Sequence, residues 1–212
     1  MKGLLFITHQ NNQYDTLDSV RIALEGGCRQ IQLRMKDAAK EAVALVGREA
    51  MALCKKVGAE LYIDDHVDVC REVGAAGVHL GKLDMPPEQA RTYLGKAYRI
   101  GGTANTFDDI CRLAEKGVDY IGLGPFRFTE TKKNLSPLLG LNGYRTILKR
   151  CQANGIRLPV LAIGGITPDD IPCLMETGIS GIALSSVILQ ADDPVKKTRE
   201  IVERMKMHES YY

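Results

Sequence analysis

Charged residues follow four short apolar segments of this 212-residue chain. They are Arg34 and Lys36 after 30–33, Asp64 and Asp65 after 61–63, Asp84 after 78–81, and Lys132 and Lys133 after 120–123. If these segments are parallel strands of one barrel, their carboxyl ends lie at the same end of it. That end would then carry acidic residues for a metal ion and several cations for phosphate, which together predict a diphosphate site.

The segment 30–36 places its polar side chains at every second position. In an extended chain residues two apart point the same way, so Gln30, Gln32, Arg34 and Lys36 share one face. A glutamine and arginine row in a buried strand is costly without a ligand or partner. We therefore interpret Arg34 and Lys36 as ligand-binding cations, the alternative being ordinary loop charges.

An acidic set follows two neighbouring segments. Asp64 and Asp65 end one and Asp84 follows the next, so two aspartates would lie within reach of one ion. Mg²⁺ commonly takes one or two protein carboxylates and completes its sphere with water and phosphate oxygens. The alternative is that each aspartate caps a helix, as Asp65 would before 66–68.

Two further loops offer groups for anions. The longest loop, 125–139, carries Thr129, Glu130, Thr131, Lys132 and Lys133, and a loop of that length is usually functional, although a solvated loop is the alternative. Gly164 and Gly165 follow a seventh segment, and Ser185 and Ser186 follow an eighth. Loops after strands seven and eight often form the phosphate site of a barrel; here the alternative is a tight turn. The pattern predicts a diphosphate site with a metal and a second site for a monophosphate.

The elements that must position these residues recur about every 25 residues as a short apolar segment, a polar loop and an amphipathic stretch. Eight such cycles are present, with the apolar segments at 4–8, 30–34, 61–64, 77–80, 99–102, 120–123, 160–163 and 181–184. Eight strand and helix cycles in about 200 residues favour a single (β/α)8 TIM barrel, an α/β fold, over a doubly wound sheet. We expect the barrel to span 1–205 and 206–212 to be a frayed tail.

Composition narrows the class of partner. The net charge of +2 indicates no nucleic-acid surface and no polybasic membrane patch, so small anionic substrates are favoured. No apolar stretch approaches a membrane span. The six cysteines are scattered without a C-x-x-C pair, which is typical of a reducing cytoplasm. We interpret His79 as a core histidine. The spacing of residues suggests no Ser-His-Asp arrangement. Assembly into a homo-oligomer remains possible on the sequence alone.

Five segments in order resemble the thiamine phosphate synthase family, also called thiamine-phosphate pyrophosphorylase. They are 32–36 (QLRMK), 63–65 (IDD), 77–86 (GVHLGKLDMP), 124–132 (GPFRFTETK) and 162–166 (AIGGI). The resemblance covers nearly the whole chain. The wider family also contains a thiazole tautomerase and relatives without an assigned activity.

The resemblance implies a barrel enzyme of thiamine biosynthesis. Such an enzyme joins 4-amino-2-methyl-5-hydroxymethylpyrimidine diphosphate to thiazole phosphate, giving thiamine phosphate and pyrophosphate, with Mg²⁺. It implies that Arg34, Lys36 and Lys132 are catalytic, and that Asp65 and Asp84 hold the metal. It implies substrate binding by Gln32, Leu33, Met35, Asp64 and Thr103, and thiazole phosphate binding by Thr129, Glu130, Thr131, Gly165, Ser185 and Ser186.

The chain departs from the family pattern at three positions. Asp64 stands where the family usually has asparagine, Thr103 where it has serine, and Asn105 where it often has histidine. Asp64 adds a negative charge beside the substrates, whereas Thr103 keeps a hydroxyl. Because a histidine near 105 is the acid and base of the tautomerase, Asn105 argues against that activity. A tautomerase and a non-catalytic thiazole-phosphate or thiamine-phosphate binding protein remain the alternatives.

Overall fold

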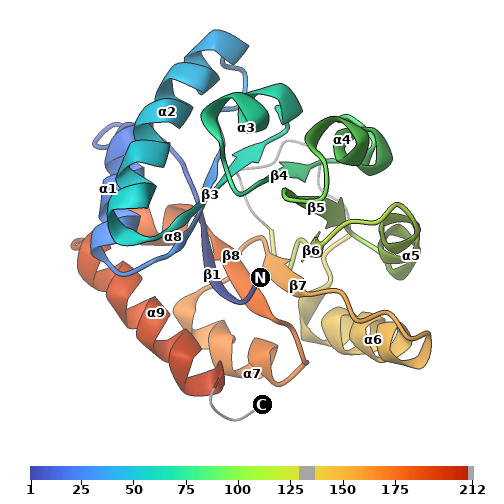
Figure 1. Cartoon of the computed structure of the whole chain (residues 1–212). Coiled ribbons are helices and arrows are strands. Elements are labelled where there is room, and N and C mark those ends of the chain that lie inside the picture. Colours follow the sequence, from blue (N-terminus) through green and yellow to red (C-terminus); the bar gives the residue numbers. More distant parts are fainter. Residues whose placement is uncertain (129–136, 210–212) are drawn as a thin grey trace.

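Eight parallel strands close into one barrel in the order of the sequence, and helices surround it (Figure 1). The computed structural model describes residues 1–128 and 137–209. The strands are β1 (Gly3–Ile7), β2 (Gln30–Leu33), β3 (Glu60–Asp64), β4 (Gly77–Leu80), β5 (Arg99–Ala104), β6 (Tyr120–Leu123), β7 (Val160–Ile163) and β8 (Gly181–Leu184). The helices are α1 (Thr16–Glu25), α2 (Lys40–Val57), α3 (Val67–Val73), α4 (Pro87–Leu94), α5 (Phe107–Glu115), α6 (Gly140–Ala153), α7 (Ile171–Met175), α8 (Ser186–Leu189) and α9 (Pro194–Glu209), with a 3-10 turn, η1, at Pro168–Asp170.

The predicted single (β/α)8 barrel is confirmed, as are all eight strand positions. The ranges of β4, β6, β7 and β8 match the expectation, and the ends of the other four strands differ by one or two residues, the largest shift being β5, which continues to Ala104. The last helix runs to Glu209, so the predicted tail 206–212 is helical as far as that residue. Residues 210–212 lie outside the described residues.

Local sequence explains where the helices begin and end. Thr106 caps α5 by accepting a hydrogen bond from the backbone of Asp109, whose own carboxylate returns to the cap. The α2 helix buries one face, which includes Val43, Ala50 and Cys54, and ends at Gly58, which has the left-handed conformation of a helix stop. Thr167 precedes η1 and donates its backbone N–H to Asp170 Oδ2, and Pro168 lies in the first turn.

The apolar side chains form two cores, one on each side of the sheet. The larger lies between the strands and the helices and includes Leu33 and Ile63. The smaller fills the barrel interior, where Tyr62 and Tyr120 meet edge to face with ring centres 5.9 Å apart. Because both faces of each strand are covered, the strands appear in the sequence as continuous apolar segments.

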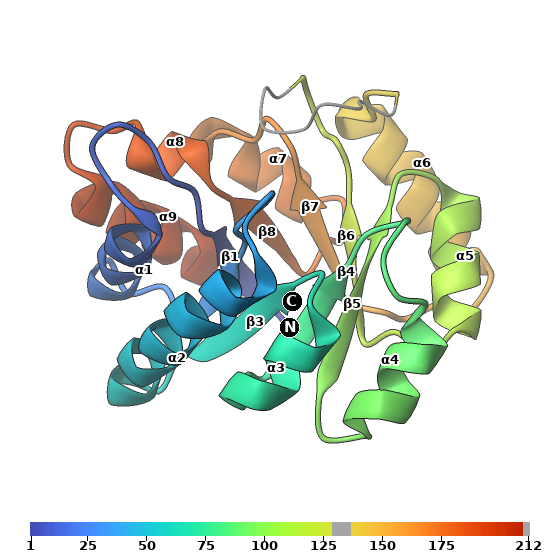
Figure 2. The same ribbon diagram turned by 90° about the horizontal axis from the view of Figure 1, so that it is seen from above.

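The register between neighbouring strands decides which loops lie side by side at the carboxyl end of the barrel, which we call its mouth. Leu33 pairs with Ile63, and Asp64 pairs with His79, so β2, β3 and β4 end side by side. In Figure 2 the carboxyl ends of these strands and the α8 helix face the same side of the molecule. No helix in the described part of the chain is long and apolar enough to cross a membrane.

Candidate functional site

The end of β2 is bonded to the end of β3 through a carboxylate. Asp64 Oδ1 accepts a hydrogen bond from Gln32 Nε2 at 2.5 Å, and its Oδ2 lies 3.3 Å from Arg34 Nε. The side chains of Arg34 and Asp64 are 21% and 12% exposed, so this ion pair is mostly shielded from solvent. It therefore holds Arg34 on one edge of its guanidinium group and leaves the Nη side for another partner.

The backbone of Arg34 is fixed separately by β1. The buried Thr8 hydroxyl accepts from Arg34 N at 2.8 Å and donates to Arg34 O at 3.1 Å. Two contacts to the backbone and one to the side chain place this cation before any ligand arrives, which is the preorganisation that anion binding requires.

The side chains of Asp65 and Asp84 lie near one another across the ends of β3 and β4, where Asp84 helps to raise the pKa of Asp65. Asp65 has a left-handed backbone (φ 65°), a conformation that costs a non-glycine residue about 1–2 kcal/mol and is often found at functional sites. Asp84 Oδ2 accepts from Gly81 N at 2.6 Å. A Cβ at position 81 would lie 2.8 Å from that oxygen, so glycine is required for the contact.

The electrostatics of the pair follow first from burial and then from the crowding of like charges. Asp65 as a residue is exposed, but its carboxyl group is partly enclosed. This burial, followed by the charges and hydrogen bonding of Asp64 and Asp84, raises the pKa of Asp65 to about 8, although Arg34 opposes the shift. Carboxyls crowded together in this way are a place that a divalent cation can occupy.

The metal-ligand set is small. In the described ranges, 1–128 and 137–209, no group of three or more His, Cys, Asp or Glu side chains is arranged to hold a metal. The two carboxylates fit Mg²⁺, which accepts one or two carboxylates when phosphate and water supply the other ligands. They do not fit a structural zinc site, which uses four protein ligands.

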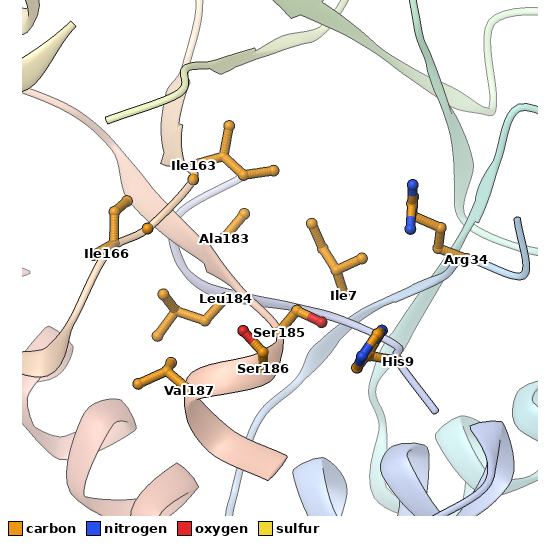
Figure 3. Close-up of a pocket in the computed structure, with 12 residues that line it drawn as sticks. Ile7, His9, Arg34, Ile163, Ile166, Ala183, Leu184, Ser185, Ser186 and Val187 are labelled. Atoms are coloured by element: carbon orange, nitrogen blue, oxygen red, sulfur yellow. The ribbon is translucent and has the colours of Figure 1, made fainter. Parts of the chain in front are cut away.

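A cavity at the ends of β1, β2, β7 and β8 lies beside this cluster (Figure 3). Its polar lining includes Ser185 and Ser186 with Arg34 and His9 on one side, and Ile163 and Ile166 lie opposite. Gly164 and Gly165 also line it with left-handed backbones, φ 93° and 65°. Glycine amides and serine hydroxyls are neutral donors suited to a phosphate group.

The structure brings together most of the predicted site residues in its described part. Gln32, Arg34, Asp64, Asp65 and Asp84 form the first cluster described above, and Gly165, Ser185 and Ser186 line the cavity. Thr103 lies at the end of β5, where its hydroxyl is 3.0 Å from His79 Nε2. His79 Nδ1 in turn contacts the Tyr120 hydroxyl at 3.2 Å, as suits the core histidine predicted.

Three predicted residues point elsewhere or fall outside the clusters. Leu33 is fully buried in the core beneath the helices, because it alternates with Gln32 and Arg34, and Met35 packs against the same core. These two side chains therefore pack in the core, and substrate binding by Leu33 and Met35 stays a prediction. Lys36 is exposed in the turn after β2 and does not line the cavity. Thr129, Glu130, Thr131 and Lys132 lie outside the described residues.

Sequence reasoning missed two residues at the end of β1. Thr8 holds the Arg34 backbone, and His9 lines the cavity. His9 makes no hydrogen bond or ion pair with residues 1–128 or 137–209. The rule that found the other residues, a polar group directly after a strand, would have found His9 had it been applied to the first strand as well.

Comparison with known proteins points to one family. The sequence model of thiamine monophosphate synthase matches residues 4–188. A thiamine-phosphate synthase from Bacteroides fragilis is 56% identical over 95% of this chain and 99% of its own length. One from Phocaeicola vulgatus is 57% identical over 94% of this chain and 96% of its own.

A solved structure agrees with the sequence relatives. The thiamine phosphate pyrophosphorylase from Pyrococcus furiosus superposes with a TM-score of 0.86 and is 33% identical, covering 97% of this chain and 96% of the other. Its fold and length match those of this chain throughout.

Proposed function

Since the chain belongs to the thiamine monophosphate synthase family, we propose that it joins the pyrimidine diphosphate to thiazole phosphate. The products are thiamine phosphate and pyrophosphate. The C–O bond between the pyrimidine methylene carbon and the diphosphate breaks, and a C–N bond to the thiazole nitrogen forms. The electron pair of the broken bond leaves with pyrophosphate.

One observation carries the proposal: Arg34 belongs to both anion-binding clusters. It contacts Asp64 on the metal side and lines the cavity that holds Ser185, Ser186 and the glycine turn. A diphosphate on the metal side and a monophosphate in the cavity would thus lie on either side of one cation. That arrangement brings two phosphorylated substrates together at a single mouth.

The protein's own groups assist departure of the diphosphate by electrostatics. Negative charge grows on pyrophosphate as the C–O bond breaks, and Arg34 is preorganised to bind it. Lys36, exposed beside the mouth, and Lys132 are proposed to add further positive charge. No protein nucleophile is required, which agrees with the absence of a Ser-His-Asp arrangement in the sequence.

We include Mg²⁺ in the proposal, held by Asp65 and Asp84. When bound, it would neutralise the diphosphate and improve it as a leaving group. The effect of Asp84 on the pKa of Asp65 supports this, because it places the two carboxyls close to one another. The proposed compartment is the cytoplasm, supported by the six cysteines, all of them free thiols.

The direct test measures pyrophosphate release from the two substrates with Mg²⁺ or with EDTA. We expect turnover with Mg²⁺, loss of turnover with EDTA, and a large loss in Asp84→Ala. Asp108→Ala is the matched control, because Asp108 is 80% exposed on α5 and its nearest cation is 3.9 Å away. Unchanged turnover in EDTA would refute the metal role.

The same assay separates the alternatives. Asn105 donates its amide to Gly124 O at 2.5 Å and has no group that exchanges a proton at neutral pH, so the structure supplies no support for a tautomerase there. Tight binding of thiazole phosphate without pyrophosphate release would point to a binding protein and would overturn the synthase proposal.

A further inference from the structure

The start of the loop after β6 lies directly against the turn after β7. Phe126 N donates to Ile163 O and Arg127 N donates to Gly164 O, both at 2.9 Å. A Cβ on Gly165 would lie 2.7 Å from Phe128 O and 2.8 Å from Arg127 Cβ. The glycine turn that lines the cavity is therefore shaped from behind by residues 126–128.

The Arg127 side chain continues this contact. Its Nη1 and Nη2 donate to the two carboxylate oxygens of Asp170, each at 2.5 Å, and Nη1 also donates to Gly165 O at 3.2 Å. A bidentate arginine and carboxylate pair has a defined geometry that a single contact lacks. Arg127 thus ties the carbonyl of the turn to Asp170, the last residue of η1.

Asp170 is the less exposed partner, and both of its carboxylate oxygens accept hydrogen bonds. Its side chain is 10% exposed, and Oδ2 also accepts from the backbone and hydroxyl of Thr167, both at 2.8 Å. The hydrogen bonds from Arg127 lower the pKa of Asp170, so it is ionised at neutral pH. One carboxylate therefore fixes both the end of the glycine turn and the side chain of Arg127.

We propose that Arg127 and Asp170 are a positioning pair that holds the Gly164–Gly165 turn in the shape that binds a phosphate monoester. Neither residue lines the cavity, so the pair acts through the turn. Glycine backbones are conformationally free, and holding them in advance removes an entropy cost from binding. The inference rests on the proposed function only in assigning the phosphate of thiazole phosphate to this turn.

The test compares Arg127→Met, Asp170→Asn and Arg127→Lys with Arg91→Met. Methionine keeps the apolar stem of arginine but no donor, and lysine keeps the charge without the bidentate geometry. Arg91 is the matched control, because it also contacts an aspartate, Asp119, at 2.5 Å and donates to backbone carbonyls, but lies away from the cavity. Calorimetry with thiazole phosphate gives Kd without requiring turnover, and steady-state assays give both KM values.

We expect Arg127→Met and Asp170→Asn to weaken thiazole phosphate binding about tenfold, or about 1.4 kcal/mol, with the KM for pyrimidine diphosphate within about twofold. Arg127→Lys should recover part of the loss, and Arg91→Met should change neither constant. Equal changes in both KM values, or no change in Kd, would overturn the proposal. Should Arg127→Met fail to fold, the Arg127→Lys comparison decides on the same criteria. Absence of turnover in the unsubstituted enzyme counts against the proposed function alone, since Kd still ranks the variants.

Discussion

Asp64 is the residue whose replacement separates stability from binding most clearly. Its carboxylate accepts from Gln32 and contacts Arg34, and it lies beside the proposed diphosphate position. Asn at this position keeps an oxygen acceptor for Gln32 but removes the negative charge. The fold then loses a charge-assisted contact while the diphosphate loses a neighbouring like charge.

The two effects have estimable sizes. A hydrogen bond to a charged group contributes about 1.5–3 kcal/mol and a neutral one about 1 kcal/mol, so Asp64→Asn should lower the free energy of unfolding by about 1 kcal/mol. Two unit charges about 4 Å apart interact by about 4 kcal/mol at an effective dielectric of 20. The diphosphate would approach Arg34 from its Nη side, farther from Asp64, so we expect about 1 kcal/mol, or roughly fivefold tighter binding of the pyrimidine diphosphate.

The assay pairs urea unfolding with calorimetric titration of the pyrimidine diphosphate in Mg²⁺. Asp68→Asn is the control, since Asp68 forms its ion pair with Lys40 on the outer surface, where both side chains are at least 40% exposed. That variant should keep its diphosphate affinity. Weaker diphosphate binding in Asp64→Asn would refute the reasoning, because it would mean that the Asp64 charge assists the site instead of opposing it.

The remaining predictions concern the cavity and one helix cap. Gly165→Ala should raise the KM for thiazole phosphate at least tenfold, whereas Gly155→Ala, also left-handed but with open space around it, should cost only about 1 kcal/mol of stability and leave the KM unchanged. His9→Ala should raise the same KM several-fold with an unaltered melting temperature; a lowered melting temperature with an unchanged KM would exclude a binding role. Burial alone would raise the pKa of Asp109. The hydrogen bonds that its carboxylate accepts, first among them the one from Lys82, outweigh burial and hold the pKa well below its usual range. Stability from the ionised group is present above the unfolded pKa of about 3.9 and is lost as pH falls through the folded value, so the melting-temperature gap between wild type and Asp109→Asn should narrow below about pH 4.

Local patterns were enough to locate the strands and most of the site. Parallel strands in a barrel all end at the same face, so the rule of a polar residue after an apolar segment found Arg34, Asp65 and Asp84 without coordinates. The same alternation that gave Gln32 and Arg34 one face assigns Leu33 and Met35 to the other. Their inclusion among the site residues came from the resemblance, and their side chains pack in the outer core.

Other features depend on contacts between segments far apart in the sequence. Thr8 and Arg34 are hydrogen-bonded although they lie 26 residues apart, and His9 lines the same cavity as Ile163. Both arrangements arise only when the barrel closes and β1 pairs with β2 and β8. The pairing of Arg127 with Asp170 spans 43 residues and joins two loops. The periodicity of a strand or helix covers only a few residues, so it cannot predict contacts between residues this far apart in the sequence.

The sequence by itself determined the fold, the face of the barrel that carries the chemistry and the residue types present there, because these follow from strand periodicity and from the common direction of parallel strands. Only the tertiary structure decided which charged groups meet: Asp64 pairs with Arg34, and Asp65 lies near Asp84. The physical reason is that a side chain's direction is set locally, whereas its partner is set by register and closure around the whole barrel.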